Sequence, residues 1–262
     1  MGDTMKLLNQ NALVTGATRG IGKAIAVALA KEGANIAITG RDAEELKNTA
    51  AEINALGRQC VSAAFDITDY DQADAFYDQA EATLGPINIL VNNAGIGSSA
   101  RPMPFTEFTD DFFELTLRTN LIAPFRLCKH AVKKMQTRNY GRIINIASIA
   151  GKTGTVHGVA YSASKHGLIG MTRSIAVEFV KHGITCNAVC PGVTKSVMND
   201  KRLNYDAKRL GREFSDVEAT STPLGRRLTP EEIAHFAVSL AMPEASGVTG
   251  QMFVIDGGAT NL

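Results

Sequence analysis

Residues 13–22 read Leu13-Val14-Thr15-Gly16-Ala17-Thr18-Arg19-Gly20-Ile21-Gly22, which is an apolar strand, a glycine-rich turn and the start of a helix. Gly16 permits a tight turn, Gly20 lets the backbone approach a ligand, and Gly22 lets the helix pack closely on the strand. The unpaired N–H groups at a helix start favour an anion. Because this turn follows the first strand and opens an amphipathic helix, it predicts binding of a dinucleotide pyrophosphate. The residues assigned to this contact are Gly16, Thr18, Arg19, Gly20, Ile21 and Gly22.

Outward from this stretch, short apolar runs alternate with longer amphipathic segments. The predicted strands are Ala12–Thr15, Asn35–Thr39, Cys60–Ala64, Ile87–Val91, Arg142–Ala147, Thr185–Val189 and Met252–Ile255. The predicted helices are Ile21–Lys31, Ala43–Leu56, Tyr70–Leu84, Asp110–Gln136, Ser162–Lys181 and Pro230–Leu240. Such alternation requires a parallel sheet with helices on both faces, because each parallel crossover needs a connecting element. We therefore expect an α/β, doubly wound fold in a single domain over residues 1–262.

The composition narrows the functional class. The formal net charge of +1 gives no overall attraction to nucleic acid or to an anionic membrane. No apolar run reaches the roughly 20 residues that span a bilayer, and residues 1–10 have no signal-like core, so we expect a cytoplasmic protein. The four cysteines and five histidines lack metal-ligand spacing, and we expect no metal site.

The end of the second predicted strand bears on which dinucleotide is bound. NAD-binding proteins usually place an acid there for the ribose 2′-hydroxyl, whereas NADP-binding proteins need cations for the 2′-phosphate. Here Gly40 and Arg41 follow the strand, with Asp42 one step later. Arg41, with Arg19 from the first turn, favours NADP over NAD. The alternative is that both arginines are solvated and that Asp42 caps the next helix.

Three residues suggest acid–base chemistry. Ser148 follows a predicted strand, while Tyr161 and Lys165 lie four apart and so share one face of a helix. A nearby ammonium favours phenolate and lowers the pKa of tyrosine from its usual value of about 10. Ser148 is then able to hold a substrate oxygen by a hydrogen bond while Tyr161 gives or takes its proton.

These residues belong to a wider set that resembles the short-chain dehydrogenase/reductase family over nearly the whole chain. The shared landmarks are Thr15-Gly16-x-x-x-Gly20-x-Gly22, Asn92-Asn93-Ala94-Gly95, Asn120, Ser148, Tyr161, Lys165 and Pro191-Gly192. The resemblance implies a Rossmann-like fold of seven parallel strands and hydride transfer at the nicotinamide C4. It implies that Tyr161 is the general acid–base, Ser148 orients the substrate, Lys165 binds the nicotinamide ribose, and Asn120 holds a water of a proton relay.

The same resemblance implies further cofactor contacts. Asp66, with Ile67 beside it, would contact the adenine, and Asn93, Ala94 and Gly95 would line the adenosine wall. Residues 191–196 would grip the nicotinamide carboxamide, through Pro191, Gly192, Thr194 and Ser196. The family also usually forms tetramers, through long helices and the carboxyl-terminal strand. We therefore expect a homotetramer.

The substrate is less well defined. Residues 193–228 are polar and irregular and are expected to form a lid. Residues 96–105, 149–159 and 197–222 should line the pocket. Lys195, Lys201, Arg202, Lys208, Arg209 and Arg212 in this lid suggest guidance of an anionic thioester. His157 is expected to be a partly exposed loop residue rather than a substrate contact.

The overall pattern resembles 3-oxoacyl reductases, polyketide-type ketoreductases and 3-hydroxybutyrate dehydrogenases. It favours reduction of a 3-oxoacyl or related β-keto substrate by NADPH, with a small-molecule ketone or secondary alcohol as the reacting partner. Two alternatives stay open. One is an NAD-dependent alcohol, hydroxysteroid or 3-hydroxybutyrate-type dehydrogenase, and the other is a non-catalytic NADP(H)-sensing module.

Overall fold

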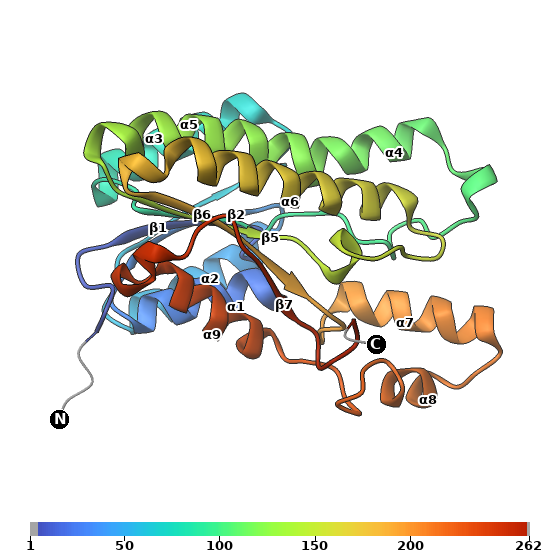
Figure 1. The fold of residues 1–262 in the computed structure, drawn as a ribbon. Coiled ribbons are helices and arrows are strands. Elements are labelled where there is room, and N and C mark those ends of the chain that lie inside the picture. Colours follow the sequence, from blue (N-terminus) through green and yellow to red (C-terminus); the bar gives the residue numbers. More distant parts are fainter. Residues whose placement is uncertain (1–4, 261–262) are drawn as a thin grey trace.

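The computed structural model describes residues 5–260 and contains one seven-stranded, all-parallel sheet (Figure 1). Its strands are β1 (Asn11–Thr15), β2 (Asn35–Gly40), β3 (Cys60–Ala64), β4 (Ile89–Asn92), β5 (Gly141–Ile146), β6 (Ile184–Pro191) and β7 (Met252–Ile255). They lie in the order β3-β2-β1-β4-β5-β6-β7. The order reverses between β1 and β4, and the carboxyl ends of strands at such a switch point are where open α/β sheets bind ligands.

Helices cover both faces of this sheet. On one face lie α1 (Gly20–Lys31), α2 (Ala43–Ala55) and α9 (Pro230–Ala241), and on the other lie α3 (Tyr70–Leu84), α4 (Asp110–Leu117), α5 (Ala123–Arg138) and α6 (Val159–Phe179) (Figure 1). The remaining helices, α7 (Val197–Leu210) and α8 (Phe214–Ala219), lie together at one end of the molecule. Within residues 5–260, no helix is both long and apolar enough to cross a membrane.

Alternation along the buried strands divides the core into two layers. In β1, Leu13 packs with the helices α3 and α5, whereas Ala12 and Val14 pack with α1 and α9. All five residues of β1 are buried, as are those of β4, β5 and β6. Both faces of these central strands are therefore apolar, which explains their continuous apolar sequence.

The prediction of one continuous helix over residues 110–136 is wrong. The structure instead has α4, a π-helical segment at Arg118–Ile122, and then α5. Pro124 has no N–H to donate to the carbonyl of Asn120, so the regular α-helical ladder is interrupted there. Such π segments are frequent at functional sites. The other predicted helix and strand bounds agree with the structure to within a few residues, the largest shift being the start of α6 at Val159.

The 193–228 segment is also more regular than its sequence suggests. It folds into α7 and α8 around a small core of Leu203, Ala207 and Val217. Buried Arg227 joins the two helices, because its guanidinium bonds Asp200 of α7 at 2.5 Å and Glu218 of α8 at 2.6 Å. Backbone hydrogen bonds between residues 193–195 and Leu228 close the base of the segment. α7 is rich in charged and amide side chains, which is why this part of the sequence reads as polar and irregular.

We predict that Gly22→Ala destabilises the protein by about 1–3 kcal/mol, the usual range for overpacking. A Cβ at residue 22 would lie within 2.3 Å of both the Gly16 carbonyl oxygen and the Asn93 amide nitrogen, where it has no room. The free energy of unfolding from urea denaturation measures the effect. Gly154→Ala is the matched control, since a Cβ there meets nothing within 4 Å. An equal effect of the two substitutions would contradict the close packing.

Candidate active site

The turn between β1 and α1 is built to receive an anion. Gly16 and Gly20 have φ values of +66° and +58°, which favour glycine. The first turn of α1 has no side-chain cap, whereas α2, α3, α7 and α9 are capped by Asp42, Asp69, Ser196 and Thr229 respectively. The space before Gly20 is open, because a Cβ there would meet only Ser196, at 3.8 Å. The uncapped N–H groups and this space fit a pyrophosphate.

Asn93 and Thr15 hold that turn against the end of β4. The Asn93 amide donates to the carbonyls of Thr15 and Gly16, both at 3.0 Å, and the Thr15 hydroxyl accepts from the backbone N–H groups of Asn93 and Ala94. The Asn93 side chain is thus used to fix the turn. Of the other residues assigned to this contact, Thr18 packs beside Gly40 and Ile21 packs on the core of α1.

Four charged residues gather near the ends of β2 and β3. Arg41 is exposed and forms no ion pair with any residue in 5–260, and the Arg19 guanidinium lies 3.9 Å from Asp42. Asp42 also caps α2, as the alternative interpretation expects. Desolvation raises the pKa of Asp66, but hydrogen bonds from Thr68 and the charge of Arg41 outweigh it, so the net shift is downward. Ile67, beside Asp66, is half-buried against the core. The exposed guanidinium of Arg41 fits a 2′-phosphate.

Ser148, Tyr161 and Lys165 come together beyond the carboxyl end of β5. Ser148 caps the short turn that follows β5, and its side chain lies near enough to the Tyr161 phenol to lower the pKa of that phenol. The Lys165 ammonium donates to the carbonyl of Ile146 at 2.8 Å and lies 5.7 Å from the centre of the Tyr161 ring. The arrangement places a hydroxyl donor beside a phenol, with an ammonium behind it.

Burial sets the proton affinities of this group. It raises the pKa of Tyr161, against a smaller lowering by the hydrogen bond with Ser148. It lowers the pKa of Lys165 to about 8. The sequence predicted a lowered pKa for Tyr161, and the structure corrects this: Lys165 is itself desolvated, its ammonium is bonded to a carbonyl, and burial dominates at the phenol.

Asn120 lies in the π-helical segment, with its side chain fully engaged. Its carboxamide oxygen accepts from the Ile96 N–H at 2.7 Å, and its nitrogen donates to the Ile96 carbonyl and to the Ser164 hydroxyl. The Ser164 hydroxyl donates in turn to the Tyr161 carbonyl at 2.7 Å. Asn120 therefore fastens the loop after β4 to the helix that carries Tyr161. Gly95 packs directly beside this carboxamide. No pattern in the sequence points to this role of Ser164.

Residues 191–196 follow β6 at the same end of the sheet. Gly192 packs against Asp256, the Thr194 hydroxyl donates to the Gly192 carbonyl at 3.1 Å, and Ser196 caps α7. Pro191 is the last residue of β6. These residues thus join the sheet to the 193–228 segment and border the opening in front of Gly20.

A small cavity adjoins Tyr161. It is lined by parts of the predicted segments 96–105 and 149–159, but also by α4, which the sequence did not assign to it. His157 lines this cavity, and its Nδ1 lies 2.6 Å from the Tyr205 hydroxyl of α7. The expectation of a partly exposed loop histidine is confirmed, and the structure adds that its side chain lines the cavity and is bonded to α7. Arg101, Phe112 and Tyr205 were not singled out from the sequence, because nothing in their spacing marks them.

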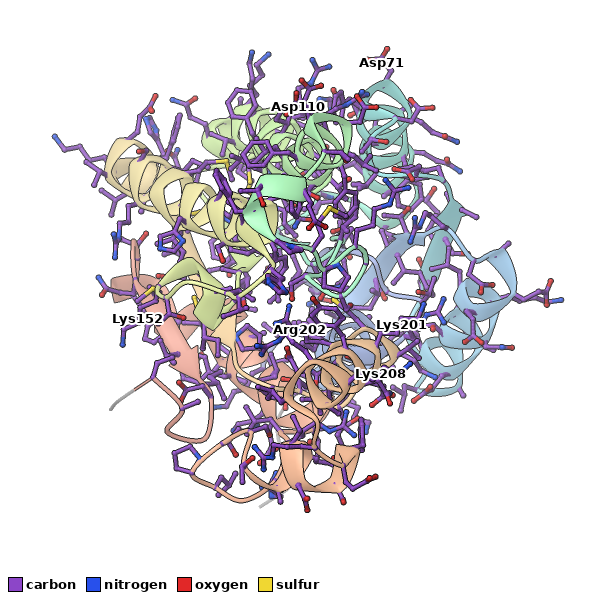
Figure 2. All side chains as sticks on the ribbon, turned by 90° about the vertical axis from the view of Figure 1, so that its right-hand side faces the viewer. Asp71, Asp110, Lys152, Lys201, Arg202 and Lys208 are labelled. Carbon is purple, nitrogen blue, oxygen red and sulfur yellow. The ribbon has the colours of Figure 1, made fainter. Side chains whose placement is uncertain are left out.

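Three of the six cations in the predicted basic stretch are held by contacts within the segment. Arg202 and Arg209 both bind the carboxylate of Asp206, and Arg212 binds the Asp216 carbonyl and the Thr220 hydroxyl. Figure 2 looks onto this end of the molecule, where Lys201, Arg202 and Lys208 are labelled on α7. Arg202 also donates to the Val156 carbonyl, while Lys201 and Lys208 are exposed. The arginines of this segment therefore serve its own folding. Within residues 5–260, no group of three or more metal-binding side chains is arranged around a common point.

Known proteins resemble the chain over its whole length. A putative ketoacyl reductase of Streptomyces coelicolor is 36% identical, covering 95% of this chain and 97% of that protein. An actinorhodin polyketide ketoreductase with a Phe-to-Trp substitution, solved with NADPH, superposes with a TM-score of 0.91 at 35% identity, covering 97% of this chain and 98% of that one.

A gluconate 5-dehydrogenase of Burkholderia cenocepacia, solved with NADP and tartrate, superposes with a TM-score of 0.89 at 33% identity. The match covers 99% of this chain and 98% of that one. The family model for short chain dehydrogenases matches residues 10–206. With the seven-stranded sheet and these relatives, the match shows that the chain belongs to the short-chain dehydrogenase/reductase family of oxidoreductases.

Proposed function

We propose that this protein transfers a hydride between NADP(H) and a ketone or secondary alcohol, with a 3-oxoacyl or related β-keto compound as the substrate class. The observation that carries the proposal is the contact of Ser148 with Tyr161 at the wall of a cavity, with Lys165 behind them. The relatives named as ketoacyl reductase and ketoreductase support the β-keto class.

Ser148 and Tyr161 have different roles in the reaction. A bound NADPH would supply the hydride from its nicotinamide C4. Ser148 donates a hydrogen bond to the carbonyl oxygen of the substrate, and Tyr161 gives that oxygen its proton as the carbonyl carbon is reduced. Because burial raises the pKa of Tyr161, the phenol is protonated at neutral pH, which suits an acid in the direction of reduction.

Lys165 and Asn120 support the proton transfer by Tyr161. The Lys165 ammonium binds the nicotinamide ribose and favours the phenolate once the proton has left. We assign the relay water to the backbone carbonyl of Asn120, since its side chain is engaged and Pro124 has no N–H for that carbonyl. Exchange of that water with solvent restores the proton on Tyr161.

The cofactor is held at four other places. The N–H groups at the start of α1 bind the pyrophosphate, beside Gly16, Gly20 and Gly22. Arg41 and Arg19 bind the 2′-phosphate, and Asp66 contacts the adenine. Residues 191–196 hold the carboxamide, and the 193–228 segment acts as the lid. Relatives solved with NADPH and with NADP support the choice of NADP over NAD.

We predict that Tyr161→Phe lowers kcat for reduction of ethyl acetoacetate by about 10²- to 10⁴-fold, because it removes the proton donor. The loss of NADPH absorbance measures turnover. Titration of NADPH fluorescence should give an unchanged dissociation constant. Tyr70→Phe, remote from Ser148, is the control. A variant that keeps full turnover would refute the assignment, and a wild-type chain that binds NADPH but reduces no ketone of a broad panel would favour the sensing module.

We predict that Arg41→Ala raises KM for NADPH by about 10- to 100-fold, the usual loss for one charge-assisted hydrogen-bonding partner. KM for NADH should change by less than about threefold, since NADH has no 2′-phosphate. Initial rates with each cofactor give both values. Lys47→Ala removes another exposed cation of the same region, on α2, and should leave both unchanged. Wild-type turnover with NADH alone would reverse the NADP assignment.

We also propose a homotetramer. Large apolar side chains are exposed on the helices of one layer: Val177 of α6 is 80% exposed, and Phe125 of α5 and Leu115 of α4 are 47% and 43% exposed. The apolar edge strand β7 is only half-buried. Exposed apolar side chains of this kind support contact with another chain.

Light scattering at micromolar concentration should give four times the 27.9 kDa mass of the chain. Val177→Glu would place a charge in the contact and is expected to yield smaller species. Leu56→Glu, on the opposite layer at the end of α2, is the control and should leave the mass unchanged. A wild-type mass of one chain would contradict the proposal.

A further inference from the structure

The cavity beside Tyr161 contains one charged side chain. Its wall includes Ser98, Arg101, Phe112, Thr116, His157 and Tyr161. Among residues 5–260, no Asp or Glu lines it. The reacting end of a substrate held by Tyr161 would therefore lie near the guanidinium of Arg101, an exposed residue that lines the same cavity.

Arg101 has no internal role that accounts for its charge. Within the described part of the chain it forms neither an ion pair nor a hydrogen bond, unlike Arg202, Arg209, Arg212 and Arg227. Its guanidinium stacks over the ring of Phe112, 5.4 Å from the ring centre. This contact holds a planar cation at the cavity wall with its N–H donors unused, a geometry suited to a carboxylate.

An outer hollow continues the cavity past Arg101. It is lined by Ala100, Arg101, Asp111, Phe112 and Leu115. Asp111 is not within 4.0 Å of the Arg101 guanidinium, and its own charge repels anions from the outer side. An anion that binds Arg101 is therefore favoured on the side of Tyr161, close to the reacting carbonyl.

His157 supplies a second donor from the opposite loop. The 2.6 Å contact with Tyr205 occupies Nδ1, and no residue in 5–260 is bonded to Nε2. If the Tyr205 hydroxyl donates to Nδ1, the neutral imidazole carries its proton on Nε2. His157 also has a φ of +57°, an uncommon conformation for a non-glycine residue that is often retained at functional sites.

We propose that this cavity selects a short oxo acid or hydroxy acid whose free carboxylate is bound by Arg101, with His157, held by Tyr205, as a second donor. The inference rests on the proposed function and specifies its substrate. The hydride adds to the carbonyl carbon, the Tyr161 proton goes to the carbonyl oxygen, and the carboxylate is unchanged.

Two further features favour a short free acid over a carrier-bound thioester. Arg202, Arg209 and Arg212 are occupied by Asp206, Asp216 and Thr220, which leaves only the three exposed lysines of the predicted basic stretch for the distant phosphates of a carrier. The contacts of Tyr205 with His157 and of Arg202 with the Val156 carbonyl close the wall between α7 and the 152–158 loop. In Figure 2, Arg202 lies between α7 and the loop that carries Lys152.

The test compares acetoacetate with its neutral methyl ester as substrates for reduction by NADPH. Arg101→Met should lower kcat/KM for acetoacetate by about 10- to 100-fold, as expected for loss of a charge-assisted pair, and change that for the ester by less than twofold. Arg101→Lys should restore part of the loss. Lys201→Met, an exposed lid cation outside the cavity, is the matched control. Tyr205→Phe should raise KM for acetoacetate more than it lowers kcat.

Equal effects of Arg101→Met on acid and ester, or no effect on either, would overturn the carboxylate assignment while leaving Tyr161-dependent ketone reduction intact. If the wild type reduces neither compound, calorimetric titration of malonate into the NADP⁺ complex tests carboxylate binding by Arg101 without the need for turnover. Binding to the wild type that is lost in Arg101→Met supports the assignment, and absence of wild-type binding refutes it.

Discussion

The close approach of three backbone segments at Gly16, Gly22 and Asn93 is the constraint on which the site depends. A methyl group at Gly16 would come within 2.8 Å of Ala94, and one at Gly22 within 2.3 Å of the Gly16 carbonyl. Because β1, α1 and the end of β4 pack this tightly, the uncapped start of α1 faces the switch point of the sheet. The anion site and the acid–base group then lie at the same edge, where β5 and β6 also end.

Buried polar groups complete the arrangement and restrict how it can move. Asn120 and Lys165 are 1% and 5% exposed, yet both are hydrogen-bonded, to Ile96 and Ser164 and to the Ile146 carbonyl respectively. Desolvation of polar groups is costly unless they have partners, so these bonds fix a single geometry around Tyr161. The interrupted helix at Arg118–Ile122 is what brings Asn120 to that position.

The sequence predicted the sheet and the grouping of Ser148, Tyr161 and Lys165 well, because both leave strong local patterns. Continuous apolar strands, the glycine turn and the spacing of Tyr161 and Lys165 need no tertiary information. The surroundings of the cavity could not be predicted from the sequence. Arg101, Phe112 and Tyr205 come together there only through contacts between different segments of the chain. The raised pKa of Tyr161 was missed since spacing shows the neighbouring ammonium but not the desolvation that outweighs it.

Transfer of deuterium tests the central claim most directly. The purified chain would be incubated with acetoacetate or its methyl ester and with NADPH carrying deuterium at C4, on one face or the other. Mass spectrometry should find one deuterium at the carbinol carbon of the product from only one of the two labelled cofactors. A product without deuterium from either, or no reduced product with any ketone, would contradict direct hydride transfer at this site.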